Sequence, residues 1–181
     1  MFIINQIVGA AWFVTLLGIA NIAPVIVVKL PWLATPVDFG GTLNGIRIFG
    51  DNKTWRGILA AIILGFLGFL LIRYLNSRVG YLQEISLINY QSIPWFFGFV
   101  IPVGVMAGDL VKSFFKRRRG VAPGQSWLPF DQIDFLLGGI LVSVFFINFS
   151  IMQIVLILVI GFLIHLAVKY LGYKLKIGPP V

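Results

Sequence analysis

The sequence predicts an all-α polytopic membrane protein, because its composition and its patterning both differ from those of soluble proteins. Of its 181 residues, 59% are hydrophobic and only 11% are charged, whereas a soluble domain carries about 25% charged residues. The apolar residues come in long runs, and a helix needs about 20 of them to span a bilayer. We expect residues 1–181 to form a single membrane-embedded domain.

Five apolar segments are long enough, or nearly long enough, to cross a bilayer. They cover residues 3–28, 58–75, 94–114, 131–149 and 151–171. No basic residue precedes the first segment, so it lacks the positive region of a signal peptide and should remain as a membrane helix. A tight break around Asn148 and Ser150 separates the last two segments, which predicts an antiparallel helical hairpin.

The distribution of basic residues predicts the orientation of the chain in a cell membrane. Five spans place the termini on opposite sides, and most basic residues in the loops and at the span ends then fall on one face: Lys29, Arg47, Lys53, Arg56, Lys116 to Arg119, Lys169, Lys174 and Lys176. The opposite face carries only Arg73, Arg78 and Glu84. The positive-inside rule therefore predicts an outside N-terminus, a cytoplasmic C-terminus and polar motifs on the cytoplasmic side.

The sequence lacks two features that would indicate particular kinds of functional site. The chain has no cysteine, which rules out a disulfide framework, a thiolate metal site and a cysteine nucleophile. The Walker pattern GxxxxGK[ST] of phosphate-binding loops is also missing.

The net charge of +8 reports membrane topology here, so we expect no nucleic-acid partner.

Residues 108–134 concentrate charge between two long apolar runs. Asp109, Lys112 and Lys116 are spaced to share one face of a helix that leaves the membrane. An ion pair within that helix, with solvated lysines, is the alternative to a functional role. Asp131 and Asp134 lie three residues apart at the start of the next span. They could cap that helix, or they could join Asp109 as ligands of Mg²⁺, which prefers a few carboxylates together with phosphate oxygens. We expect these three aspartates to be the metal ligands.

Basic and glycine residues near these acids could bind phosphate groups. Lys116 and Arg117 begin a run of four bases, and Gly124 lies close behind them, where a glycine lets the backbone approach a phosphate. The run could also serve only as a topology signal. A second group, Lys53, Thr54 and Arg56, precedes the segment 58–75 and adds two bases and a hydroxyl.

Two polar residues lie within apolar segments. Asn21 comes shortly before Pro24, and a proline there removes a backbone hydrogen bond and favours a kinked helix that suits a ligand pocket. A kink that serves packing alone remains an alternative. His165 is the one histidine of the chain, and we expect it to be packed rather than catalytic.

These motifs together resemble the CDP-archaeol synthase family, the small archaeal relatives of bacterial phosphatidate cytidylyltransferases. The resemblance covers essentially the whole chain. The residues that carry it are 21–24, 51–57, 108–120, 123–124 and 129–134. The family's Pro-Ala-Asn signature on the first span is matched loosely, because Ile19 takes the position of the proline.

The resemblance implies a Mg²⁺-dependent nucleotidyltransferase that moves CMP from CTP to an isoprenoid diether lipid phosphate in the bilayer. The acceptor would be unsaturated archaetidic acid, 2,3-bis-O-geranylgeranyl-glycerol 1-phosphate, and the products CDP-archaeol and pyrophosphate. The catalytic group would comprise Asp109, Lys112, Asp131 and Asp134. The substrate-binding group would comprise Asn21, Lys53, Thr54, Arg56, Lys116, Arg117 and Gly124.

Three alternatives remain open at the level of the sequence. The first is the same reaction on a phosphatidic acid, since apolar spans do not distinguish ether from ester lipids. The second is an ion-coupled membrane transporter, although such proteins usually show inverted repeats and acids near the bilayer midplane. The third is a structural membrane protein, which would have little reason to gather three acids beside five bases.

Overall fold

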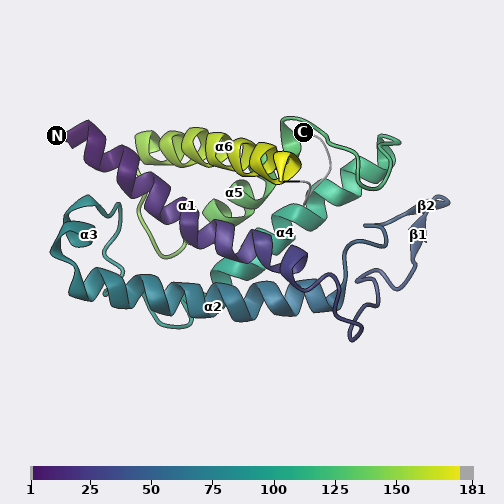
Figure 1. Ribbon diagram of the computed structural model, residues 1–181, viewed down its shortest axis with the longest axis horizontal. Coiled ribbons are helices and arrows are strands. Elements are labelled where there is room, and N and C mark those ends of the chain that lie inside the picture. Colours follow the sequence, from purple (N-terminus) through teal and green to yellow (C-terminus); the bar gives the residue numbers. More distant parts are fainter. Residues whose placement is uncertain (1, 176–181) are drawn as a thin grey trace.

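The computed structural model describes residues 2–175 as a bundle of helices (Figure 1). The long helices are α1 (Phe2–Ile26), α2 (Trp55–Arg78), α4 (Phe97–Arg118) and α6 (Ile151–Lys174). Shorter elements are α3 (Gly80–Ile85), α5 (Phe130–Ser143) and the strands β1 (Thr42–Leu43) and β2 (Ile46–Arg47). The predicted helical architecture is confirmed, whereas Lys176, which contributed to the predicted charge asymmetry, lies outside the described residues.

Four helices in this part of the chain, α1, α2, α4 and α6, are long and apolar enough to cross a membrane. The fifth predicted span corresponds to α5, which has 14 residues. At a rise of about 1.5 Å per residue, α5 is roughly 21 Å long and shorter than the roughly 30 Å hydrocarbon core of a bilayer. The predicted count of five spans is therefore not confirmed.

The prediction that the helix after Pro129 continues to residue 149 is wrong, because α5 ends at Ser143. The chain then turns so that the Phe146 ring packs edge-on against Phe97, with ring centroids 5.3 Å apart. It continues to Ser150, whose side chain accepts a hydrogen bond from the backbone N–H of Gln153 and caps α6. The predicted break between the last two helices is thus present, but it begins earlier than the apolar sequence indicates.

Other helix boundaries differ from the predicted ones by up to four residues, and the ends of α2 and α4 lie beyond the apolar segments. The predicted segments 58–75 and 94–114 correspond to α2 and α4, which begin at Trp55 and Phe97 and end at Arg78 and Arg118. Lys116 and Arg117 therefore lie on the last turn of α4. At the end of the predicted segment 3–28, α1 runs through Pro24 and ends at Ile26.

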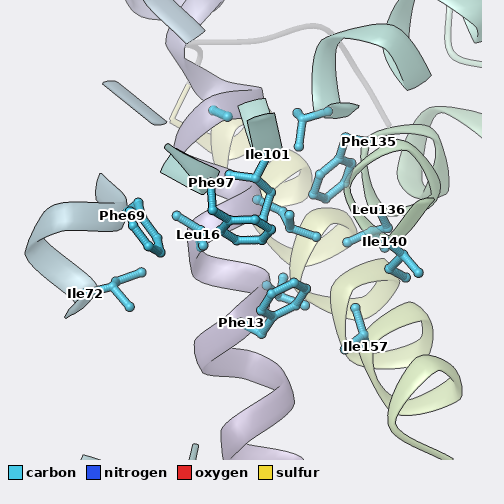
Figure 2. Packing of buried hydrophobic residues seen from close by; sticks show 14 of the residues in the cluster. Phe13, Leu16, Phe69, Ile72, Phe97, Ile101, Phe135, Leu136, Ile140 and Ile157 are labelled. Carbon is cyan, nitrogen blue, oxygen red and sulfur yellow. The ribbon is translucent and has the colours of Figure 1, made fainter. Parts of the chain in front are cut away.

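The hydrophobic core lies where α1, α2, α4, α5 and α6 meet (Figure 2). Figure 2 shows Phe13 and Leu16 of α1 beside Phe97 and Ile101 of α4, and all four are fully buried. Phe69 of α2 meets Phe97 edge to face, with ring centroids 5.6 Å apart. The packing of these buried side chains from three helices constrains the rotation of each helix, and hence the direction of the polar side chains further along it.

Glycines allow α4 and α5 to approach each other closely. A Cβ atom on Gly108 would collide with the backbone oxygen of Asp134, and one on Gly138 would collide with that of Gly104. Gly104 and Gly108 are four residues apart on one face of α4, a spacing that lets membrane helices pack backbone to backbone. Asp109 follows Gly108 directly, so this contact brings the acids of the two helices to the same place.

The long loop between α1 and α2 is organised around Asp38. Its carboxylate accepts hydrogen bonds from the Arg47 guanidinium, at 2.7 Å, and from the backbone N–H groups of Phe49 and Gly50. Burial alone would raise the pKa of Asp38, but these hydrogen bonds outweigh it and lower the pKa to about 2. The loop is therefore held by a carboxylate that stays charged.

The carbonyl groups of this loop also hold the start of α2. The backbone N–H groups of Trp55 and Arg56 donate to the carbonyl oxygens of Thr35 and Leu33, at 3.1 and 2.9 Å. Lys53 accepts a backbone hydrogen bond from Val37 at 2.7 Å. The residues just before α2 are thereby fixed against the end of the bundle at which α4 terminates (Figure 1).

Candidate active site

A cavity of about 500 Å³ opens at the end of the bundle where α2 begins and α4 ends. Every predicted site residue except Arg117 lines it: Asn21, Lys53, Thr54, Arg56, Asp109, Lys112, Lys116, Gly124, Asp131 and Asp134. Arg117 lines a neighbouring pocket of about 100 Å³, which Lys53, Lys112, Lys116 and Gly124 share. The motifs that the sequence spreads over more than 100 residues therefore meet in one place.

The three predicted metal ligands converge on a lysine. The Lys112 Nζ atom lies 3.1 Å from a carboxylate oxygen of Asp109, 3.1 Å from one of Asp131 and 2.8 Å from one of Asp134. All four side chains are at most 13% exposed. Because water hardly reaches them, these charges depend on one another for stabilisation.

Two further lysines also bind carboxylates of this group. Lys53 donates to both oxygens of Asp109, at 2.8 and 2.5 Å. Lys116 donates to both oxygens of Asp131, at 3.1 and 3.0 Å. Asp131 also accepts a hydrogen bond from the backbone N–H of Trp127 at 2.7 Å, which ties the segment before α5 to the site. We call Asp109, Asp131, Asp134, Lys53, Lys112 and Lys116 the charged centre; it comprises three negative and three positive side chains.

The positions of these side chains follow from helix geometry. Asp109, Lys112 and Lys116 are three and four residues apart, so they lie along one face of α4. Asp131 and Asp134 share a face of α5 for the same reason. The glycine contact between the two helices then brings the faces together, and the loop that precedes α2 adds Lys53 from a third direction.

The four bases at the end of α4 do not act as one group. Lys116 belongs to the charged centre, and the Arg117 side chain passes beside Gly50 of the long loop. Arg118 turns away: its guanidinium stacks 3.3 Å from the centre of the Phe114 ring and donates to the Phe114 carbonyl oxygen at 3.1 Å. Of these bases, Lys116 and Arg117 are therefore placed to meet a ligand, and Arg118 is not.

Thr54 and Arg56 line the cavity and also make structural contacts. The Thr54 hydroxyl oxygen accepts the backbone N–H of Gly57 at 3.4 Å and caps α2. This capping contact does not use the hydroxyl proton. The Arg56 guanidinium donates to the carbonyl oxygen of Leu30.

The sequence interpretation missed the contribution of α6 to the cavity. His165 packs against the Phe135 ring, as expected for a packed histidine, but it also lines the cavity. Lys169 lines it one turn later and donates to the Ser126 hydroxyl at 2.7 Å. The four-residue spacing of these polar residues on an otherwise apolar helix is the signal that could have identified this wall.

One side of the cavity is apolar. Its lining includes Pro24, Val25, Val28, Ile58, Met106 and Leu110. Val25 on the last turn of α1 and Val28 just after that helix are 62% and 55% exposed, so this wall continues onto the outer surface at the end of α1. A ligand with both a charged head and a long apolar tail would suit a cavity of this kind.

The chemistry of the acids fits a hard cation such as Mg²⁺, since all the donor atoms are carboxylate oxygens. Their arrangement does not, because the Lys112 ammonium lies among them. Within residues 2–175, no three acidic or imidazole side chains are placed to hold a metal ion. A divalent cation could bind here only after Lys112 moves, so Mg²⁺ dependence stays a prediction.

Comparison with known proteins gives consistent matches over nearly the whole chain. The family model of CarS-like CDP-archaeol synthases matches residues 3–179. A CDP-archaeol synthase of Pyrococcus furiosus is 34% identical over 175 residues, which cover 95% of this chain and 96% of the relative. That of Sulfolobus acidocaldarius is 34% identical over 170 residues, with 90% and 94% covered.

A solved structure also resembles the chain. It is described as an intramembrane enzyme for archaeal membrane lipid biosynthesis and is 29% identical in sequence. The two folds superimpose with a TM-score of 0.71 over 90% of this chain and 93% of the other.

Proposed function

Because this chain belongs to the CDP-archaeol synthase family, we propose that it transfers CMP from CTP to 2,3-bis-O-geranylgeranyl-glycerol 1-phosphate and releases CDP-archaeol and pyrophosphate. One observation carries this proposal: the same cavity joins a charged centre to an apolar wall that continues onto the outer surface of α1. A nucleotide needs the first feature, and a lipid acceptor needs both.

The reaction requires little acid–base chemistry from the protein. An oxygen of the lipid phosphate forms a bond to the α-phosphorus of CTP, and the bond from that phosphorus to the bridging oxygen of the β-phosphate breaks. Pyrophosphate departs with the electron pair. The second pKa of a phosphate monoester is about 6, so the attacking oxygen is already an anion near neutral pH. The protein contributes mainly alignment and charge neutralisation.

The bases around the charged centre are assigned to the phosphate groups. Lys116 and Arg117 lie together on the last turn of α4 and would hold the leaving pyrophosphate, with Gly124 allowing close approach of the backbone. Lys53, Thr54 and Arg56 enter the cavity from the start of α2 and would bind the nucleotide or the lipid phosphate. Asn21 adds an amide to the wall formed by α1.

Asp109, Asp131 and Asp134 are assigned to a divalent cation, Mg²⁺ by the preference of oxygen ligands. Such a cation would neutralise charge on the transferring phosphate. Until it binds, the three carboxylates are held by Lys53, Lys112 and Lys116.

The lipid tails are assigned to the apolar wall. Val25, Val28, Ile58 and Leu110 offer no charge that would oppose isoprenoid chains. Tails placed there could remain in the bilayer while the phosphate reaches the charged centre. CTP, by contrast, must arrive from water at the end of the bundle.

The site end of the bundle is assigned to the cytoplasmic side of the cell membrane. Most basic residues that lie outside the apolar spans are near this end, and the positive-inside rule places such an end in the cytoplasm. The N-terminus of α1 then lies outside and the C-terminus of α6 inside, which requires α5 to complete a fifth crossing.

The decisive experiment uses the purified protein in detergent with radiolabelled CTP, Mg²⁺ and the geranylgeranyl diether phosphate. Lipid-dependent release of pyrophosphate, together with a labelled CDP-lipid, is the expected result. Release without lipid, or none at all, would contradict the proposal. A parallel reaction with diacylglycerol phosphate tests the runner-up, a phosphatidate cytidylyltransferase.

A transporter would use its charges differently. Its acids would lie near the middle of the bilayer, whereas the three aspartates lie at the end of the bundle where α2 begins. Asp109 pairs with Lys53, just before α2, and Asp131 and Asp134 lie in the first two turns of α5. The geometry therefore favours the enzyme.

A further inference from the structure

Lys112 lies at the point where the three carboxylates of the charged centre converge. Its ammonium contacts one oxygen from each of Asp109, Asp131 and Asp134, at 3.1, 3.1 and 2.8 Å. No other side chain described here contacts all three. Lys53 and Lys116 each bind one aspartate from outside.

An ammonium and a divalent cation cannot share this position. Both are positive, and at 4 Å or less their repulsion is strong in a poorly hydrated site. Three carboxylates carry enough charge for a divalent cation, but the three lysines already balance that charge. A divalent cation that arrived alone would have to displace one of these pairings.

We propose that Lys112 is a resident cation: it holds the three carboxylates together in the empty enzyme and withdraws when a divalent cation binds. This inference rests on the proposed role of the aspartates as ligands of a divalent cation. It adds to that role a positioning function for Lys112, which holds the three aspartates in place before the cation binds.

The structure also shows where the displaced ammonium can go. Lys112 lines the main cavity and the adjoining pocket of about 100 Å³, in which it is joined by Lys116 and Arg117. A lysine side chain has four rotatable carbon–carbon bonds, so its ammonium can change position without any backbone movement. Withdrawal toward Lys116 and Arg117 would place a third base beside the pyrophosphate portion of CTP.

This exchange makes the binding of cation and nucleotide interdependent. A withdrawn Lys112 needs a new anionic partner, and the phosphates of CTP supply it. A nucleotide that favours the withdrawn lysine therefore strengthens the binding of the cation. By linkage, the cation strengthens the binding of the nucleotide by the same factor. The empty enzyme is therefore expected to bind divalent cations weakly.

The first test measures Mn²⁺ binding by electron paramagnetic resonance in the wild type and in Lys112→Met, without nucleotide. The variant should bind Mn²⁺ at least about tenfold more tightly, a factor in the usual range of coupling between sites. Lys169→Met is the matched control, because Lys169 lines the same cavity but donates to Ser126 and should leave Mn²⁺ affinity unchanged. Equal affinities of the wild type and Lys112→Met would overturn the inference.

A second test needs no variant, since removal of Lys112 leaves three carboxylates facing one another and could prevent folding. Lysine acetylation of the wild type is followed by mass spectrometry with and without Mn²⁺ and a non-hydrolysable CTP analogue. Lys112 should be protected in the empty protein, and Mn²⁺ alone at saturating concentration should increase its labelling several-fold while Lys169 stays unchanged. Labelling of Lys112 that Mn²⁺ does not alter would contradict the exchange.

These outcomes separate the inference from the proposed function. Equal Mn²⁺ affinities together with normal lipid-dependent pyrophosphate release would overturn the role of Lys112 and leave the reaction standing. If neither protein bound Mn²⁺ even with the CTP analogue, the cation role of the aspartates would fall, and the inference with it.

Discussion

The Nζ atom of Lys112 lies 2.8 Å from Oδ2 of Asp134, and this ion pair joins α4 to α5 beside the contact of Gly108 with the Asp134 backbone. Only 4% of the Asp134 side chain is exposed. A carboxylate in such a position is not needed for solubility, and its charge must be matched by nearby cations. The pair therefore links the packing of two helices to the charge balance of the site.

Replacing Asp134 with asparagine should abolish most activity while the protein still folds. The variant keeps the shape of the side chain, and Lys112 retains Asp109 and Asp131 as partners. Loss of one charge from the centre should lower lipid-dependent pyrophosphate release by at least about 100-fold, the usual scale for losing one preorganised electrostatic contact. Activity is measured with labelled CTP, and folding by size-exclusion chromatography and thermal unfolding in detergent.

Glu84→Gln is the matched control for this experiment. It also removes one carboxylate charge, but Glu84 is exposed on α3 and does not line the cavity. Its activity should equal that of the wild type. Near-normal turnover by the Asp134→Asn variant would remove Asp134 from the proposed mechanism.

Replacing Gly108 with alanine should separate α4 from α5. The added methyl group would collide with the backbone oxygen of Asp134, which cannot rotate away as a flexible side chain could. Overpacking of this kind costs about 1–3 kcal/mol, so both the melting temperature and the activity should fall. Gly18→Ala on α1 is the control, because open space surrounds that position and alanine favours a helix. Equal melting temperatures for the two variants would contradict the close contact.

Local periodicity was enough to predict which site residues share a helix face. Asp109 and Lys112 lie one turn apart in any helix, and so do Asp131 and Asp134. The sequence could not show that α5 ends at Ser143, because the residues after it remain apolar up to Ile147. The end depends on the packing of Phe146 against Phe97, a contact between distant segments.

The partner of the three aspartates was also beyond the sequence. The three acids were expected to meet a metal ion, and Lys112 was expected only as a member of the catalytic group. Its actual position depends on how closely α4 and α5 pack and on the direction from which Lys53 arrives, and the long loop sets that direction. The pairing of Lys112 with Asp109 follows from their spacing, but its contacts with Asp131 and Asp134 depend on how the two helices pack in the folded chain.

Replacing Thr54 with serine should preserve activity, whereas replacing it with aspartate should weaken substrate binding. As the cap of α2, this side chain needs only an oxygen that accepts the backbone N–H of Gly57, and serine and aspartate both provide one. A carboxylate in the cavity, however, would repel phosphate groups. Thr54→Asp should therefore keep the melting temperature within a few degrees and raise the KM for CTP or for the lipid by about tenfold or more. An unchanged KM for both substrates would exclude Thr54 from phosphate binding.

The loop between α1 and α2 should loosen in acid because of Asp38. The pKa of this carboxyl is about 2 in the folded protein, below the value of about 3.9 in an unfolded chain. Its stabilising contribution is thus complete above about pH 4 and is lost as the pH falls toward 2. Protection of the Phe49 and Gly50 amides from hydrogen exchange, corrected for intrinsic rates, should decrease over this interval. Asp38→Asn should show the low protection already at neutral pH, and full protection in that variant would contradict the assignment.

Arg117 and Arg118 are adjacent bases that should differ sharply when each is replaced by methionine. Arg117 lines the small pocket beside Lys112 and Lys116, where the pyrophosphate is proposed to leave. Arg118 stacks on Phe114 and does not line either pocket at this end of the bundle. Arg117→Met should lower kcat/KM for CTP by at least about tenfold, as expected for one lost charged contact to phosphate. Arg118→Met should change it less than about twofold, within the scatter of neutral surface substitutions.

Both variants remove one positive charge from the same helix end, so a general loss of electrostatic attraction for CTP would affect them equally. Equal losses in the two variants would show that the bases act only through their summed charge, and the pocket beside Lys112 would then have no specific role.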